Sequence, residues 1–429
     1  MRDSWAPAFA GELKFLAGLL LLFQISFEGV AFCLSIGGRF SLDAPSTDYD
    51  VRMVETGGVE MPFGDEVLKP EIGLALSGGG FRATLFHVGA LRRLVELGIL
   101  HRVDRISSVS GGSIVSGRLA EVWGEFAADP SVATYDRLIA KPLRAFCRLE
   151  IDAAAISRGI FSPFSTAADA VEAKYAEHLF AKTLDQMPDR PVFVFNATNM
   201  QTGRSFRFSK AYLADWRLGL IRRPKLPIAR AVAASSAFPP FFSPVVLKKP
   251  GRFEMVEGAD LNADPAFTAT LHLADGGVYD NLGLETIWNR CETVLVSDAG
   301  APFAVGATPE RDWVRQTMRA LDVATDQSRG LRKRALVADL KAKARAGGYW
   351  GIDTDIANYG LGDAMRCDPV KTAPLATIRT RLDPFGPQEQ GELINWGYAL
   401  ADAAVRRHAP QLVTTPVAAR WPVANFALG

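Results

Sequence analysis

Apolar runs of strand length alternate with stretches of helical periodicity over residues 70–415. Residues 71–76 (EIGLAL) are an apolar run, and residues 81–98 then carry apolar side chains three or four positions apart. The same order returns in residues 103–110 (VDRISSVS) and 111–127. Parallel strands need crossover connections, which are usually helices. These strand–turn–helix units therefore predict an α/β domain with a mostly parallel central sheet flanked by helices.

Later segments continue this pattern toward the C-terminus. The apolar and polar periodicities predict six more elements there: strands at 191–200 and 291–300, a helix ending in a turn at 227–245, a strand ending in a turn at 272–283, and helices at 309–345 and 389–408. No internal repeat or low-complexity tract interrupts them. The pattern predicts one domain over residues 70–415, followed by a short tail at residues 416–429.

The first 36 residues carry a membrane-like pattern. Residues 15–36 (FLAGLLLLFQISFEGVAFCLSI) form an apolar run long enough to span a bilayer, with Gln24, Ser26 and Glu28 near its middle. We expect residues 1–36 to anchor the protein at a membrane, while a cleaved export signal and a soluble packing helix stay open as alternatives. Residues 37–69 are rich in Gly, Pro and Asp and are predicted to be a linker.

Composition narrows the chemistry that the domain performs. The 429 residues carry a net charge of +1, which gives no electrostatic reason to expect a nucleic acid as partner. The four cysteines have no CxxC spacing, and the five histidines include no HExxH or HxH pair. The sequence therefore predicts no metal site.

Three consecutive glycines, Gly78, Gly79 and Gly80, separate the first predicted strand from its helix. The amides of such a turn bind anions, so a phosphate, a dinucleotide or the oxyanion of a reacting ester would fit. A dinucleotide site also needs a carboxylate at the end of the next strand, but that strand has Asp104 at its start and ends in Ser110. The phosphate-binding sequence GxxxxGK[ST] is absent. By themselves the glycines also fit an ordinary tight turn.

The second strand ends in a pattern typical of a nucleophile elbow. Ser110 stands at the junction of strand and helix, followed by Gly111 and Gly112. The elbow is usually written G-x-S-x-G, because small neighbours let the strained backbone turn sharply. Ser108 replaces its first glycine, and Gly112 holds its last position. Taken alone, the pattern also fits a serine that caps a helix.

A nucleophilic serine needs a base, and the histidines of this chain lie outside the loops where a Ser-Asp-His order would place one. Asp275 is the leading alternative, because an apolar strand delivers it to a Gly-Gly turn. Asp298 also ends a strand and is its rival, whereas Asp280 has the surroundings of a turn residue.

Together, the motifs GGGFR (78–82), SVSGG (108–112) and DGGVYDN (275–281) resemble the patatin-like phospholipases. The stretches HVGALRRL, NATNMQTGRSFRF and ARAVAASSAFPPFF are similar to that family as well. Each motif alone is common, but their combination in this order and spacing is specific. The resemblance covers residues 70–281 well and the remainder loosely. Ser108 departs from the family pattern, which leaves open how sharply the strand turns.

The resemblance implies a three-layer sandwich and a Ser–Asp dyad without a histidine. Ser110 would attack an ester carbonyl, and Asp275 would serve as base. Burial would raise the pKa of this carboxyl and make it a stronger base. The family implies an oxyanion loop whose donors are the amides of Gly78, Gly79 and Gly80. Arg82 would brace that loop or contact a lipid phosphate.

The expected function is that of a lipid acyl hydrolase of phospholipase A type, which cleaves fatty acyl esters through an acyl-enzyme without a cofactor. Its partners would be an acyl-lipid substrate and a membrane surface. Residues 238–242 (FPPFF) would line an acyl pocket or belong to the core, and a basic stretch at residues 332–343 would contact anionic headgroups or simply face solvent. An esterase or thioesterase for soluble substrates, a non-catalytic membrane scaffold and a nucleotide-binding protein are the alternatives.

Overall fold

A computed structural model describes residues 68–151, 167–240, 242, 244–309 and 311–429. These residues belong to one compact unit, Glu60–Gly429. The predicted N-terminal segment and the predicted linker up to residue 67 lie outside the described residues. Within the described part of the chain, no helix combines the length and the apolar character needed to cross a membrane.

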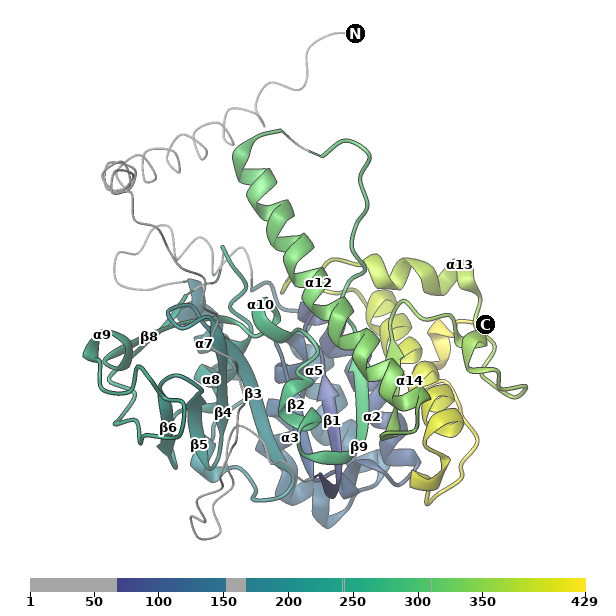
Figure 1. Ribbon diagram of the computed structural model, residues 1–429. Coiled ribbons are helices and arrows are strands. Elements are labelled where there is room, and N and C mark those ends of the chain that lie inside the picture. The colour runs from purple at the N-terminus through teal and green to yellow at the C-terminus, as the bar shows by residue number, and fades with distance from the viewer. Residues whose placement is uncertain (1–67, 152–166, 241, 243, 310) are drawn as a thin grey trace. The chain divides into compact units, whose positions relative to one another are not determined.

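Five parallel strands form one side of the sheet (Figure 1), in the order β10-β9-β1-β2-β3 with β10 at the edge. Their bounds are Lys69–Leu76 for β1, Arg105–Ser108 for β2, Val192–Asn199 for β3, Cys291–Asp298 for β9 and Ala346–Gly351 for β10. The predicted strands at 71–76, 103–110, 191–200 and 291–300 are confirmed. Sequence reasoning missed β10, which is short and rich in glycine.

Antiparallel strands extend the sheet beyond β3. β4 (Arg204–Ser209), β5 (Tyr212–Asp215) and β6 (Gly219–Arg222) follow one another as a meander. β8 (Thr270–Asp275) pairs with the end of β3, and β7 (Val245–Lys248) pairs with β8. The fold is therefore α/β with a mixed, largely parallel central sheet, and the meander was not foreseen.

Helices cover both faces of the sheet. Leu74 and Leu76 of β1 pack on the face that holds α2 (Gly80–Glu96) and α14 (Pro387–His408). Ala75 points to the opposite face, which α12 (Trp313–Lys341) covers. Successive side chains of a strand point to opposite faces, so a strand covered on both sides reads as a continuous apolar run. This layering explains the pattern EIGLAL.

The predicted helices at 81–98, 111–127, 309–345 and 389–408 are confirmed as α2, α3, α12 and α14. Of these, α3 spans Gly111–Ala128. The other helices among the described residues are α4 (Val132–Tyr135), α5 (Lys141–Phe146), α7 (Ala167–His178), α8 (Ile228–Ser235), α9 (Pro265–Thr268), α10 (Gly277–Asp280), α11 (Glu285–Trp288) and α13 (Pro369–Thr372). Short 3₁₀ or π turns lie at Leu100–Arg102, Asp136–Ala140, Leu184–Gln186, Ile356–Tyr359, Ala373–Thr377, Pro410–Leu412 and Ala424–Phe426.

Residues 416–429, which the sequence sets apart as a tail, pack against the domain. Arg93 of α2 donates a hydrogen bond to the Val417 carbonyl at 2.7 Å. The side-chain amide of Asn395 on α14 donates to the carbonyls of Val423 and Phe426. Leu428 is fully buried. These contacts join the end of the chain to the layer formed by α2 and α14.

Candidate active site

Ser110 lies between the end of β2 and the start of α3 in a strained backbone conformation. Its φ is 50° and its ψ is −119°, values that L-residues other than glycine rarely adopt. The turn is tight enough to exclude a side chain from the next two positions. A Cβ on Gly111 would overlap the carbonyl oxygen of Gly80, and one on Gly112 would overlap that of Leu76. The backbone therefore has the geometry of a nucleophile elbow.

Hydrogen bonds from α8 hold this elbow in place. The Ser110 amide donates to the carbonyl oxygen of Ser235 at 3.1 Å and lies 3.0 Å from its hydroxyl oxygen. The Ser235 hydroxyl in turn donates to the Asn196 carbonyl of β3 at 2.7 Å. Sequence reasoning missed Ser235. A small polar residue near the end of a helix carries no signal that it will face a distant turn.

Ser108 occupies the position where the elbow motif has glycine, and the structure accommodates its side chain. Its hydroxyl lies 2.6 Å from that of Ser116 and accepts a hydrogen bond from Ser113 at 3.1 Å. Ser113 also contacts the hydroxyl of Ser235 at 2.8 Å. The additional hydroxyl is thus satisfied inside a buried group of serines beneath the elbow. The substitution does not prevent the sharp turn at Ser110.

Asp275 ends β8 and its carboxyl meets the elbow. β8 brings it opposite Ala197 of β3, and its backbone amide donates to the Ala237 carbonyl at 2.9 Å. One carboxylate oxygen accepts the Gly277 amide at 2.7 Å, and the carboxyl also hydrogen-bonds the Ser110 hydroxyl. Burial raises the pKa of Asp275 to about 7, against the smaller opposing effects of the Gly277 and Ser110 hydrogen bonds.

The glycine-rich turn lies beside this pair. Gly79 has φ 140° and Gly80 has φ 56°, so both positions favour glycine. The Gly78 amide donates to the Asn281 carbonyl at 3.0 Å, which engages a donor that the sequence had assigned to an oxyanion. We find no acceptor for the amides of Gly79, Gly80 and Gly111 among the described residues. These N–H groups belong to the first turns of α2 and α3, where helices leave donors unpaired.

Arg82 is fully buried and braces the glycine-rich turn. Its guanidinium donates to the Ala299 carbonyl at 3.2 and 2.9 Å and to the Ile378 carbonyl at 2.7 Å. Burial and the nearby charge of Arg329 lower its pKa to about 10, so the side chain stays cationic at neutral pH. All three nitrogens are occupied by backbone oxygens. This arrangement fits the bracing role better than contact with a phosphate.

The other ionisable groups near the strand ends have different partners. Asp298 pairs with Arg329 at 2.8 Å and accepts the Tyr349 hydroxyl at 2.8 Å. Despite the opposing effect of burial, the charge of Arg329 holds the pKa of Asp298 below its usual value. Asp280 accepts the amides of Leu282 and Glu285, as a turn residue does. Asp298 and Asp280 therefore have structural partners of their own.

A histidine does lie close to this region, but it is structural. The two ring nitrogens of His87 lie 2.8 Å from the Ser297 hydroxyl and 3.0 Å from the Ser77 carbonyl. Complete burial lowers its pKa to about 4. His87 is therefore neutral at physiological pH, and both nitrogens are already engaged.

A cavity of about 550 Å³ opens over Ser110 and Asp275. Phe238, Pro239 and Phe242 line it, in agreement with one of the two predictions for the FPPFF stretch. The opposite wall comes from residues 300–304 and one side of α12. The apolar residues of this wall include Pro302, Phe303 and Met318. Its polar residues include Arg319, Asp322, Thr325 and Asp326. Sequence reasoning missed this wall, because nothing local indicates that α12 will face Ser110.

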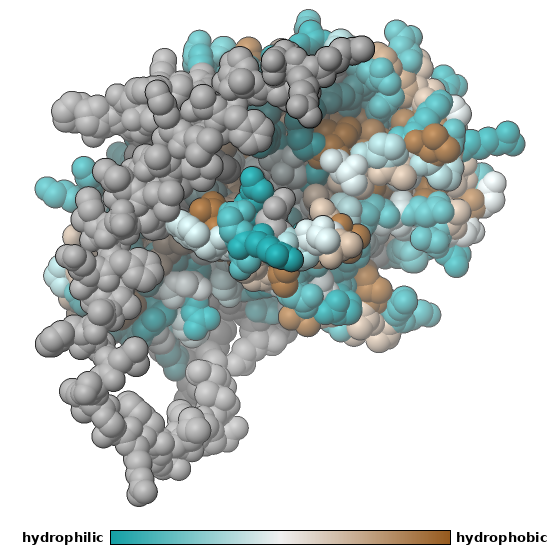
Figure 2. Space-filling model, turned by 90° about the horizontal axis from the view of Figure 1, so that it is seen from above, coloured by the Kyte–Doolittle hydropathy of each residue, from teal (hydrophilic) through white to brown (hydrophobic). Residues whose placement is uncertain are grey.

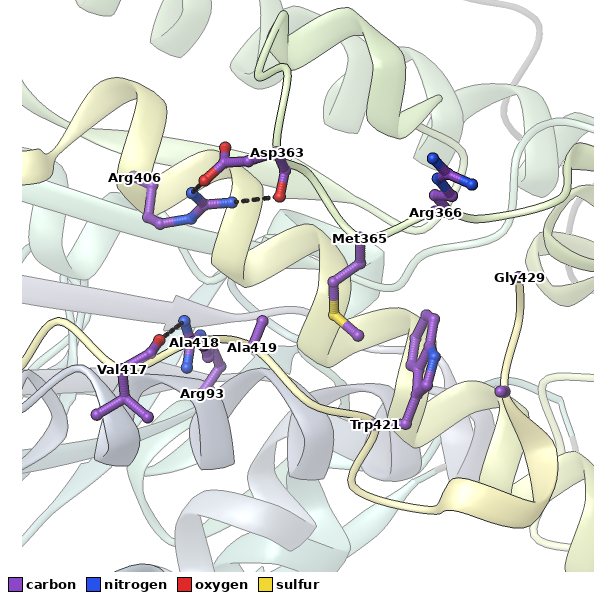
Figure 3. Close-up of a pocket in the computed structure, with 11 residues that line it drawn as sticks. Arg93, Asp363, Met365, Arg366, Arg406, Val417, Ala418, Ala419, Trp421 and Gly429 are labelled. Carbon is purple, nitrogen blue, oxygen red and sulfur yellow. Dashed lines mark hydrogen bonds and ion pairs between the residues drawn. The ribbon is translucent and has the colours of Figure 1, made fainter.

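A second cavity, of about 530 Å³, shares no residue with the first and lies between the C-terminal segment and residues 363–366 (Figure 3). Met365 and Trp421 face each other across it. Its arginines are largely neutralised by their neighbours, since Arg406 pairs with Asp363 and Arg93 with Asp402. Across the described residues, no group of His, Cys, Asp or Glu side chains could hold a metal ion.

Several solved structures are similar to this chain at low sequence identity. No curated protein matches the chain. Among solved structures, human GIVD cytosolic phospholipase A2 has 14% identity and a TM-score of 0.44, with 81% of this chain and 60% of that chain covered. VipD from Legionella pneumophila has 15% identity and a TM-score of 0.32, with 79% and 67% covered. The chain thus spans less than two thirds of the human enzyme.

The family comparison is more specific. The model of the family described as patatin-like phospholipase matches residues 74–288. That range includes the glycine-rich turn, the elbow with Ser110, and Asp275. The match extends over half of the chain, so this protein belongs to the patatin-like phospholipase family.

Proposed function

We propose that this protein is a lipid acyl hydrolase of phospholipase A type that cleaves fatty acyl esters through an acyl-enzyme. One observation carries the proposal: the hydroxyl of Ser110, on a strained elbow, hydrogen-bonds the buried carboxyl of Asp275. Family membership makes hydrolysis of an ester bond the expected reaction class. The following steps describe how these residues would carry it out.

In the first half of the reaction, Ser110 Oγ attacks the ester carbonyl carbon while Asp275 takes the hydroxyl proton. The carbonyl oxygen becomes an oxyanion, which the amides of Gly79, Gly80 and Gly111 are placed to stabilise. Each such donor contributes about 3 kcal/mol in comparable hydrolases. The tetrahedral intermediate then collapses, the alcohol leaves with the proton from Asp275, and the fatty acyl group stays on Ser110.

In the second half, water attacks the acyl carbonyl and transfers a proton to Asp275. A second tetrahedral intermediate collapses, and the proton on Asp275 returns to Ser110 Oγ as the fatty acid leaves. Asp275 suits this role because an aspartate with its usual pKa is a weak base toward a hydroxyl. A carboxyl with a pKa of about 7 accepts a proton more readily and is still ionised in half of the molecules at neutral pH.

The lining of the cavity supports the proposal that the substrate carries a fatty acyl chain. Phe238, Phe242 and Phe303 provide an apolar lining next to Ser110, suited to a hydrocarbon chain. Polar side chains of α12 line another part of the same cavity, where the polar portion of a lipid beyond the ester would lie. Because Arg82 is occupied by backbone carbonyls, we assign it to bracing rather than to a headgroup phosphate.

The direct test is the release of fatty acid from mixed phospholipid vesicles by the wild type, Ser110→Ala and Asp275→Asn. We expect release by the wild type and its loss in both variants. Ser209→Ala is the matched control, because Ser209 is a buried serine whose hydroxyl has no hydrogen-bond partner among the described residues. Full activity of Ser110→Ala would refute the assignment. Activity on soluble esters alone would favour an esterase, and no activity on either substrate would favour a scaffold.

A further inference from the structure

α12 presents one exposed face along its whole length. On the side turned away from the sheet, every third or fourth residue from Trp313 to Lys341 is exposed, and none of them is acidic. Most are apolar, and the largest are Trp313 (51% exposed), Val323 (43%) and Leu331 (60%). Arg334 and Lys341 continue the same face. A helix face of this composition in contact with water indicates a surface that binds a partner.

The opposite face of the same helix belongs to the catalytic cavity. Met318, Asp322, Thr325 and Arg329 lie about one turn apart and line the cavity above Ser110. Figure 1 shows the N-terminal part of α12 extending beyond the ends of the strands. Figure 2 looks down on that end of the molecule, where hydrophobic side chains reach the surface among hydrophilic ones. A partner bound along α12 would therefore lie next to the cavity wall.

Charge indicates the chemistry of that partner. α12 contains seven basic and three acidic residues, whereas the whole chain has a net charge of only +1. Some of these cations are paired within the protein, such as Arg329 with Asp298 and Lys333 with Asp353. Arg334 and Lys341 remain exposed on the outward face. The helix thus combines exposed apolar side chains with a local positive charge.

We propose that the outward face of α12 lies on the surface of a lipid bilayer containing anionic lipids. This inference rests on the proposed function, because it places the cavity wall against the source of an acyl-lipid substrate. Interfacial helices combine Trp or Leu on one side with Lys or Arg near the headgroups. Each basic side chain near an anionic surface adds to the attraction, which salt screens. Docking would give lipid a short path from the bilayer to Ser110.

The test measures vesicle binding in the absence of catalysis. The full chain carrying Ser110→Ala is sedimented with vesicles of phosphatidylcholine, alone or mixed with phosphatidylserine. A test variant adds Val323→Glu and Leu331→Glu on the outward face. A matched control variant adds Met255→Glu and Val370→Glu, which introduce the same charges at positions 69% and 80% exposed elsewhere. A second test variant, Arg334→Glu with Lys341→Glu, reverses the charge at the two exposed basic positions of this face.

We expect the control variant to bind mixed vesicles as the parent does. The variant with Val323→Glu and Leu331→Glu should bind them more weakly, by about tenfold or a larger factor. The charge variant should lose the preference for phosphatidylserine. Equal binding by the first test variant and the control would overturn the proposal. The proposal would also be overturned if the parent protein were a dimer, and if the α12 substitutions dissociated that dimer without changing vesicle binding. A second copy of the chain would then occupy this face.

A separate assay distinguishes this proposal from the proposed function. With Ser110 intact, hydrolysis of a soluble short-chain ester reports on the dyad without a membrane. Ester hydrolysis that persists in the α12 variants, together with their loss of vesicle binding, would support both proposals. If the protein with Ser110 intact bound vesicles but did not hydrolyse the ester, only the proposed function would be refuted.

Discussion

The hydroxyl of Ser110 hydrogen-bonds the carboxyl of Asp275, and both groups are buried beside the amides of a glycine-rich turn. β2 positions the serine and β8 the aspartate, two strands that both neighbour β3. The pair is therefore fixed by the sheet itself and not by flexible loops. In the proposed reaction, the pair acts only when one carboxyl, that of Asp275, is ionised.

The pH dependence of hydrolysis should follow Asp275. Its pKa is raised to about 7 by burial, and only the ionised carboxylate can accept the Ser110 proton. We expect kcat/KM for a soluble ester to be constant well above this pKa and to fall about tenfold per pH unit below it. A pH–rate profile whose acidic limb has its midpoint near pH 4, the usual range of an aspartate, would contradict a buried base.

The same carboxyl should make the folded protein less stable as pH rises. Its pKa is about 7 when folded and 3.8 when exposed, so between these values the folded state holds a proton that the unfolded chain releases. The free energy of unfolding therefore decreases with pH across this window. Asp275→Asn removes this dependence, and we expect the variant to gain stability over the wild type as the pH rises from 4 to 8. Denaturant unfolding at several pH values measures the difference.

If the wild type and Asp275→Asn show the same change in unfolding free energy between pH 4 and 8, Asp275 does not hold the proton. A parallel measurement on Asp260→Asn provides the control. That carboxyl is exposed and pairs with Arg217, and the pairing lowers its pKa. Asp260→Asn should leave the pH dependence of the unfolding free energy above pH 4 nearly unchanged.

Much of this site could be predicted from the sequence. Ser110 and Asp275 each end an apolar run, and the ends of strands in an α/β sheet lie at the edge where ligands bind. The glycine-rich turn was placed correctly because its glycines fall between a strand and a helix. The meander of β4, β5 and β6 was not predicted, because its short strands resemble irregular polar segments and their pairing depends on partners across the sheet.

Gly112 is required by packing within the elbow. A methyl group at this position would overlap the Leu76 carbonyl oxygen. We expect Gly112→Ala to destabilise the protein by about 1–3 kcal/mol through overpacking and to reduce esterase activity as Ser110 shifts. Gly124→Ala on the same helix is the control, since nothing lies within 4 Å of its Cβ. That change should stabilise the helix by about 0.5–1 kcal/mol. If Gly112→Ala lowered neither the unfolding free energy nor the esterase activity, the turn would be less tight than described.

Arg82 should matter for both stability and activity. Replacing it by Met would leave the carbonyls of Ala299 and Ile378 without donors inside the protein. Unsatisfied buried groups cost about 1–3 kcal/mol each, so denaturant unfolding should show a loss of that order or more. Arg137→Met is the control, because Arg137 is exposed and forms a surface ion pair with Glu125 that contributes little. If Arg82→Met behaves like this control, Arg82 does not brace the turn.

Other contacts of the site could not be predicted from sequence. The bond from the Ser110 amide to Ser235 joins the turn before α3 to the end of α8, and Arg82 reaches the Ala299 carbonyl beyond β9. The engagement of the Gly78 amide by Asn281 also depends on how α10 packs. These pairings follow from the order of strands in the sheet, which periodicity along the chain does not specify.

The central claim is that Ser110 is the nucleophile and Asp275 its base. The most direct measurement is covalent capture by a fluorophosphonate ester, which reacts with activated serines, followed by peptide mass mapping and a rate comparison. We predict one adduct, on Ser110, whose formation in Asp275→Asn is slower by about 100-fold or more. An adduct on another residue, or equal labelling rates in the wild type and Asp275→Asn, would contradict the account.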